Sequence, residues 1–173
     1  APDMKTILIV GGSLGARTIN ESILQYLDLV GQSDVQFIWQ TGKVYYEAIK
    51  ERLQNEELPN LKATDFISDM GAAYKAADLV ISRAGASSIS EFCLIGKPVI
   101  LVPSPNVAED HQTKNAMALV NRNAAVYVKD SEAVDVLLKT ALHTVGDAKK
   151  LESLKENILK LGLKNSADVI ADE

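Results

Sequence analysis

Several features that mark other classes of protein are missing from this chain. It has one cysteine, Cys93, so a disulfide framework is excluded, and the apolar segment around that residue indicates a buried thiol. No apolar run approaches the roughly 20 residues that a membrane-spanning helix needs. The N-terminus shows no signal-peptide pattern, so we expect a cytoplasmic protein.

The charge and the length restrict the function further. The formal net charge is −5, which argues against nucleic acid as a partner and against strong attraction to anionic lipids. With 173 residues, 47% of them hydrophobic, the chain can bury one good core, so we expect residues 1–173 to form a single domain. Because the chain opens with Ala-Pro-Asp instead of methionine, we expect this domain to be part of a longer protein.

Short apolar, β-branched runs alternate with amphipathic segments. The runs predict about six strands, at 6–10, 35–39, 61–64, 79–81, 99–102 and 124–128. Helices are predicted at 16–29, 44–57, 110–122, 131–142 and 148–161, with a short one that Ser68 or Asp69 caps and another that begins near Ser87. This alternation is typical of an α/β fold, a Rossmann-like parallel sheet with helices on both faces. Ligands of such sheets bind beyond the carboxyl ends of the strands.

The clearest candidate site follows the fourth strand. Ala84-Gly85-Ala86 lets the backbone turn, and Ser87 and Ser88 suit the start of the next helix, whose unpaired N–H groups favour a phosphate. Glu91 lies about one turn into this helix, where its carboxylate can accept hydrogen bonds from the hydroxyls of a ribose. The same carboxylate can cap the helix, and the residues alone leave both interpretations open.

A second glycine-rich turn, 11–17, follows the first strand. Its glycines permit close approach of the backbone to a phosphate, and Ser13 adds a hydroxyl donor. The glycine spacing differs from the dinucleotide fingerprint, and Gln40-Thr41-Gly42 stands where that motif has an acidic residue, so a nicotinamide cofactor is disfavoured. Gly96-Lys97 is followed by Pro98, which excludes the P-loop signature.

Two more segments fall at the same edge of the predicted sheet. Ile67 lies in a strand-to-helix loop, where its backbone can contact a planar base or its side chain can act as a hydrophobic staple. Gln112 offers both a donor and an acceptor, which suits sugar hydroxyls. The neighbouring His111 is either a ligand contact or a capping or surface histidine.

These motifs, in this order, resemble those in the C-terminal half of glycosyltransferase family 28. The residues that carry the resemblance span nearly the whole chain, at 11–17, 66–70, 82–86 with Ser90-Glu91, 96–98, and 110–112 with Asn115-Ala116. The resemblance implies a GT-B enzyme of two Rossmann-like domains, of which this chain is the one that binds the UDP-sugar donor. The N-terminal acceptor domain would be absent from this chain.

The resemblance also implies roles for single residues. Ser13, with Gly12 and Gly15 in the glycine loop, would contact the donor diphosphate, and the Ile67 backbone would pair with uracil. Glu91 would hold the ribose and Gln112 the N-acetylglucosamine, while His111 stands where the family often has a second glutamine. The remaining contacts would run along the ribose and phosphates, from Ala86, Ser87, Ser88, Ile89 and Ser90.

By the same resemblance, a hydroxyl of lipid I attacks the anomeric carbon of UDP-N-acetylglucosamine with inversion, and UDP leaves. Neither a metal nor another cofactor is implied, and the chain has no acidic pair spaced like a metal-binding Asp-x-Asp. The general base and the membrane contact would belong to the missing domain, so we expect a peripheral protein at the inner face of the plasma membrane.

Three other functions fit similar nucleotide contacts. The chain can be the donor subunit of a two-component glycosyltransferase that recruits a separate membrane partner. It can belong to a UDP-N-acetylglucosamine 2-epimerase, or it can be a non-catalytic sugar-nucleotide sensor.

Overall fold

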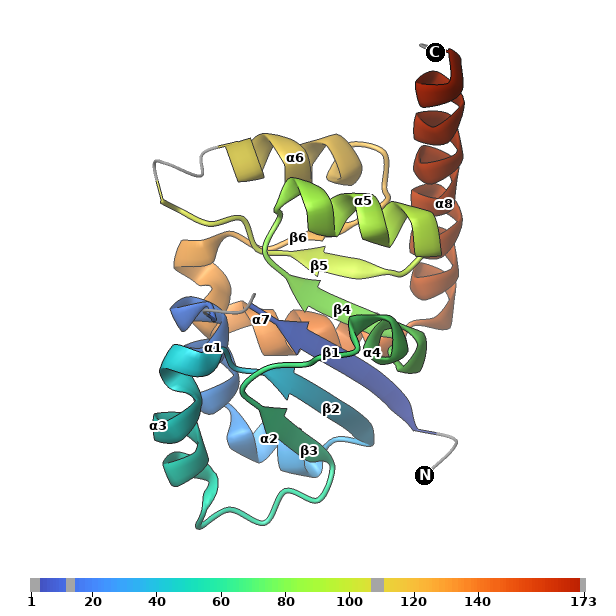
Figure 1. Cartoon of the computed structure of the whole chain (residues 1–173). Helices are drawn as coiled ribbons and strands as arrows, with labels where there is room; N and C mark the ends of the chain where they lie inside the picture. The colour runs from blue at the N-terminus through green and yellow to red at the C-terminus, as the bar shows by residue number, and fades with distance from the viewer. Residues whose placement is uncertain (1–3, 12–14, 107–110, 172–173) are drawn as a thin grey trace.

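The computed structural model describes residues 4–11, 15–106 and 111–171. Figure 1 shows one parallel sheet between two layers of helices, as the sequence predicts. Its strands lie in the order β3-β2-β1-β4-β5-β6. In chain order they are β1 (Lys5–Val10), β2 (Val35–Gln40), β3 (Leu61–Thr64), β4 (Leu79–Ser82), β5 (Val99–Leu101) and β6 (Val126–Tyr127).

The helices that connect the strands cover both faces of the sheet. One face packs against α1 (Arg17–Leu24), α2 (Leu27–Gln32), α3 (Lys43–Leu53) and α7 (Asp130–Val145). The other face packs against α4 (Met70–Ala76), α5 (Ala86–Ile95), α6 (His111–Val120) and α8 (Ala148–Ala171). No helix in the described part of the chain is long and apolar enough to cross a lipid bilayer.

The core explains why the central strands are apolar throughout. Successive side chains of a strand point to opposite faces of the sheet, so Ile7 and Ile9 enter one helix layer and Leu8 and Val10 the other. A strand that is buried on both sides has no position for a polar residue in its middle. Cys93 is buried as predicted, and burial raises the pKa of its thiol.

Most predicted helices have somewhat different bounds in the structure, and the one expected at 44–57 is α3, which ends at Leu53. Three further differences change the architecture. The helix at 16–29 is two helices, because the chain leaves the helical conformation at Tyr26 (φ −127°, ψ 40°) and restarts with Leu27 facing the core. The last strand, expected at 124–128, keeps only two residues, because the Ala124 N–H donates to Leu119 at the end of α6. The final helix, expected to end at residue 161, continues to Ala171.

The strand order reverses between β1 and β4. From β1 the chain moves outward to β2 and β3, and then returns to place β4 on the other side of β1. The loops that follow β1 and β4 therefore diverge toward opposite faces and leave a crevice at the carboxyl ends of the strands. Figure 1 shows the start of α5 at this edge.

Candidate ligand-binding site

A cavity of about 350 Å³ lies at this crevice. It brings together the ends of β1, β2 and β4, the loop after β3, and the first turns of α5 and α6. Three residues predicted as ligand contacts line it, namely Ile67, Ser88 and Gln112. The other lining residues are Val10, Gly11, Gln40, Phe66, Ser68, Met70, Tyr74, Ser82, Arg83 and Gly85.

The N-terminus of α5 opens on the cavity without a side-chain cap. Its N-cap is Gly85, so no side-chain oxygen satisfies the first N–H groups of the helix. Unpaired N–H groups at a helix start carry about half a positive charge and bind anions. Ser87 is exposed and Ser88 half-buried, so a hydroxyl donor stands beside these amides. This arrangement suits a phosphate.

Glu91 does not cap α5. The helix begins at Ala86, its first turn has no acidic residue, and Glu91 is exposed in the second turn, so the capping interpretation is wrong. The carboxylate lies near Tyr74 of α4, whose ring meets Phe92 edge-on with the centroids 5.5 Å apart. Burial, together with this carboxylate, raises the pKa of Tyr74 to about 12. Glu91 thus lies beside Tyr74, which lines the cavity, but Glu91 itself is not a lining residue. The same holds for four other predicted contacts of this helix, Ala86, Ser87, Ile89 and Ser90.

Ile67 lines the cavity, and its N–H is already engaged. The side chain of Gln40, at the end of β2, accepts a hydrogen bond from it at 2.9 Å. Asp69 caps α4 as predicted, because its carboxylate accepts from the Ala72 N–H at 3.0 Å. Sequence reasoning missed Gln40, whose role depends on a partner 27 residues away.

Gln112 joins two loops of the site. Its Oε1 accepts from the Ala84 N–H (3.2 Å) before α5 and from the Ser104 N–H (2.9 Å) after β5. Gln112 is 8% exposed, so these bonds are shielded from water. The oxygen therefore holds the two loops together. The adjacent His111 is exposed and does not line the cavity.

The glycine-rich turn is only partly described. Gly12 and Ser13 lie outside the described residues, so their predicted phosphate contacts have no structural account. Gly15 has φ +92°, and a Cβ there would meet the Thr41 carbonyl oxygen at 2.4 Å. Asn20 fixes the start of α1 nearby, since it donates to the Thr41 carbonyl and accepts from the Trp39 indole, both at 2.9 Å.

Arg83 is a lining residue that the motifs did not predict as functional. Its guanidinium forms an ion pair with Asp130 at the start of α7 and donates to the carbonyls of Val102 and Pro103. Asp130 also accepts from the Thr18 hydroxyl of α1 at 3.2 Å. The pair therefore fixes the end of β4 against two helices, and its charge is balanced within the protein.

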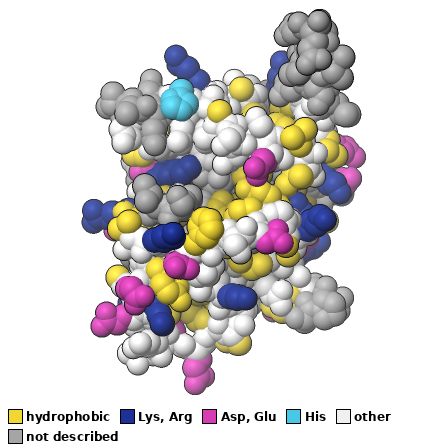
Figure 2. Space-filling model, in the orientation of Figure 1, with side chains coloured by type: hydrophobic (Ala, Val, Ile, Leu, Met, Phe, Trp, Pro, Cys, Tyr) yellow, Lys and Arg dark blue, Asp and Glu magenta, His cyan; other side chains and the backbone are white. Residues whose placement is uncertain are grey.

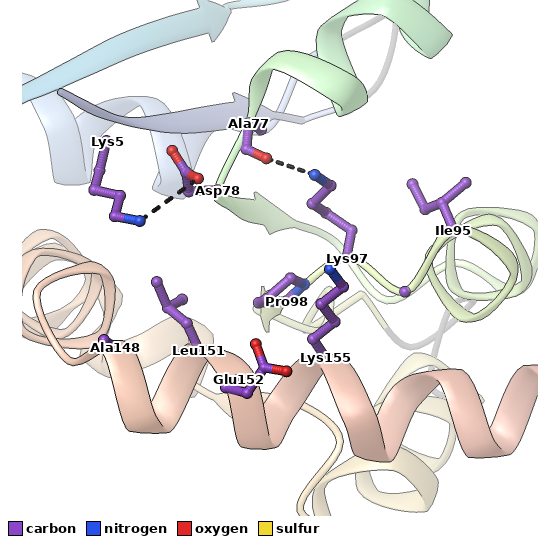
Figure 3. A pocket seen from close by; sticks show the side chains of 11 residues that line it. Lys5, Ala77, Asp78, Ile95, Lys97, Pro98, Ala148, Leu151, Glu152 and Lys155 are labelled. Carbon is purple, nitrogen blue, oxygen red and sulfur yellow. Dashed lines mark hydrogen bonds and ion pairs between the residues drawn. The ribbon is translucent and has the colours of Figure 1, made fainter. Parts of the chain in front are cut away.

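The Gly-Lys-Pro motif lies elsewhere, in a cavity of about 390 Å³ at the amino edge of the sheet. Figure 3 shows Lys97 reaching the carbonyl oxygen of Ala77, to which its Nζ donates at 2.6 Å. Ala77 is the C-cap of α4, where a cation is favourable. Burial is the main cause that lowers the pKa of Lys97. The motif thus holds α4 in place instead of touching the cavity at the carboxyl edge.

The surface carries no single dominant charge on the face that Figure 2 shows. Acidic and basic side chains intermingle there with hydrophobic ones. Among the described residues, no three His, Cys, Asp or Glu side chains come together as they would around a metal ion.

Comparison with known proteins identifies relatives of the whole chain. The sequence profile described as "Glycosyltransferase family 28 C-terminal domain" matches residues 6–172. The UDP-N-acetylglucosamine--N-acetylmuramyl-(pentapeptide) pyrophosphoryl-undecaprenol N-acetylglucosamine transferase of Bacteroides fragilis is 65% identical over 99% of this chain and 46% of its own length. The chain thus spans about half the length of the curated relatives that it matches.

Solved structures share the fold. MurG of Acinetobacter baumannii is 31% identical with a TM-score of 0.75, over 100% of this chain and 51% of that one. ALG13 matches with a TM-score of 0.58 over 80% of this chain and 86% of its own, at 18% identity, a likeness that concerns the fold alone.

Proposed function

The chain belongs to the glycosyltransferase family 28 C-terminal domain family, and from this we propose that it binds UDP-N-acetylglucosamine in an inverting N-acetylglucosaminyltransferase. The whole enzyme would transfer the sugar to lipid I and so make lipid II for peptidoglycan. The observation that carries the proposal is the cavity at the switch point, which places an uncapped helix start beside Ile67 and Gln112.

The cavity supports a division into subsites. The base would contact the Ile67 backbone, and the diphosphate would lie at the α5 amides near Ser88. Glu91 would accept from the ribose hydroxyls, and the Gln112 amide nitrogen would donate to the sugar. As UDP leaves, negative charge builds on the diphosphate, and fixed N–H groups stabilise it without rearrangement.

The other steps need groups that these described residues do not supply. Relatives are about twice as long as this chain, and we assign the general base and the acceptor site to the N-terminal half that they contain. The same half would contact the membrane, at its cytoplasmic face, as a peripheral protein. This chain alone would bind the donor weakly, because no second domain closes over it, and would not turn it over.

Titration calorimetry of the chain with UDP-N-acetylglucosamine, UDP and NAD tests the proposal. We expect binding that requires uridine and that Glu91→Ala weakens at least tenfold, while the exposed α8 residue Glu156→Ala leaves it unchanged. Equal binding of NAD, or equal effects of the two substitutions, contradicts a uridine site at Glu91.

A further inference from the structure

Gln40 is a buried polar residue at the base end of the cavity. It ends β2, is 4% exposed, and lines the cavity together with Ile67. Its Oε1 accepts from the Ile67 N–H at 2.9 Å. The backbone donor of a residue that lines the cavity is therefore held by a side-chain oxygen of the protein itself.

The segment that contains Ile67 is fixed in one conformation. The Thr41 N–H donates to the Thr64 carbonyl at 2.9 Å, which extends the ladder between β2 and β3 beyond the strands. The Phe66 N–H donates to the Asp65 carboxylate at 2.8 Å. By contrast, no group in the described ranges donates a hydrogen bond to the Ile67 carbonyl oxygen. The segment thus presents an occupied N–H next to a carbonyl oxygen that can accept.

A uracil ring carries a carbonyl oxygen next to an N–H, and this pair complements a backbone N–H next to a carbonyl. One N–H cannot form two hydrogen bonds of good geometry at once. We propose that Gln40 competes with the base, because its carboxamide oxygen occupies the place at the Ile67 N–H that the uracil carbonyl takes over on binding. This inference rests on the proposed function and adds a residue to its base subsite.

The exchange has a consequence for affinity. In the empty site the hydrogen bond from Ile67 to Gln40 has to break before the base can bind, so it opposes binding of the base. Removing the carboxamide takes this partner from the Ile67 N–H in the empty site, which raises the free energy of the empty state. Substitutions of Gln40 that remove this hydrogen bond should therefore tighten the binding of uridine nucleotides.

The experiment compares Gln40→Leu and Gln40→Asn, which is one methylene shorter, with wild type. Gln36→Leu is the matched control, since Gln36 lies on the same face of β2 at its far end. Binding of UDP and of inorganic pyrophosphate is measured by nuclear magnetic resonance titration. We expect Q40L and Q40N to bind UDP about three- to tenfold more tightly, the effect of one neutral hydrogen bond, with pyrophosphate affinity unchanged.

Amide hydrogen exchange at Ile67 provides a readout without ligand. We expect faster exchange of this N–H in Q40L and Q40N, and wild-type exchange in Q36L. If wild type binds no uridine nucleotide, the proposed function fails and this inference with it. If wild type binds UDP but both Gln40 variants bind it equally or more weakly, the proposed function stands and the role of Gln40 is wrong. Should Q40L not fold, Q40N alone decides between these outcomes.

Discussion

The carboxylate of Asp130 forms an ion pair with the guanidinium of Arg83 at the carboxyl end of β4, although the two residues lie 47 positions apart in the sequence. Their side chains are 14% and 19% exposed. The pair joins β4 to α7, and through the Thr18 hydroxyl it also joins α1. A charge network thus fixes the strand end from which α5 and its N–H groups project.

Asp130→Asn tests this network. The substitution keeps the size of the side chain but leaves the Arg83 cation without its counter-charge, so we expect a loss of about 2 kcal/mol in the free energy of unfolding. Asp135→Asn, at an exposed position of the same helix, should change it by less than about 0.5 kcal/mol. Urea denaturation of both variants provides the comparison, and equal effects would show that the pair adds nothing.

Two substitutions of Gln112 should separate its structural role from a contact with the sugar. Gln112→Glu keeps an oxygen that accepts from Ala84 and Ser104, so we expect a folded protein, but its carboxylate lines the same cavity as the diphosphate and should weaken the binding of UDP and of UDP-N-acetylglucosamine alike. It loses the amide donors, so its preference for UDP-N-acetylglucosamine over UDP should disappear. Gln112→Leu loses the acceptor as well, and should cost about 2 kcal/mol of stability through two unsatisfied N–H groups. Retained preference in Q112E contradicts a sugar contact by Gln112.

Gly15→Ala should destabilise the glycine-rich turn. At φ +92° a side chain is strained, and the new Cβ would meet the Thr41 carbonyl oxygen, so we expect a loss of at least about 2 kcal/mol. Gly71→Ala, in α4, is the control, since the nearest atom to its new Cβ would be Asp69 Oδ1 at 3.5 Å, an ordinary van der Waals contact. Alanine favours helices, so G71A should be neutral or stabilise by up to about 1 kcal/mol. Thermal unfolding of the two variants should shift in opposite directions or differ clearly in size.

The raised pKa of Tyr74 predicts that stability depends on pH in the alkaline range. Burial and the Glu91 carboxylate raise its pKa to about 12, whereas the phenol of an unfolded chain ionises near pH 10. Between these values the unfolded state releases the proton and the folded state keeps it. The free energy of unfolding should therefore fall from about pH 10 to about pH 12 and not depend on this group below pH 10. In Tyr74→Phe the free energy of unfolding, measured by urea denaturation at pH 9 and pH 11, should fall less between these two pH values than in wild type. An equal fall in both proteins would contradict the raised pKa of Tyr74.

The sequence predicts the central strands well because they are buried on both faces, whereas the edge strands β3 and β6 are only partly buried. The run from Ile7 to Val10 has to be apolar in a parallel sheet, so composition alone identifies it. The break at Tyr26 was not predicted, since the apolar spacing continues across it and only packing against the core decides where the helix restarts. The convergence of Ile67, Ser88 and Gln112 follows from the topology, because all three come after carboxyl ends of parallel strands.

The hydrogen bonds and side-chain positions within the site could not be predicted in the same way. Gln40 and Ile67 are 27 residues apart, and the sequence between them has no pattern that reports a hydrogen bond from a loop N–H to a side chain. The capping interpretation of Glu91 depended on where α5 begins, and helix boundaries are uncertain by a few residues from sequence alone. That uncertainty is as large as the distance between a first-turn and a second-turn position.

The assignments of single residues all depend on binding of the UDP-sugar at the carboxyl ends of the strands. Backbone amide chemical shifts of the chain, followed during titration with UDP-N-acetylglucosamine, test this directly. We expect the largest shifts at Ile67, Ser88 and Gln112, and no change at Lys97 and Lys155 in the opposite cavity. Shifts that gather at the amino edge, or saturation without any change at Ile67 and Ser88, would contradict it.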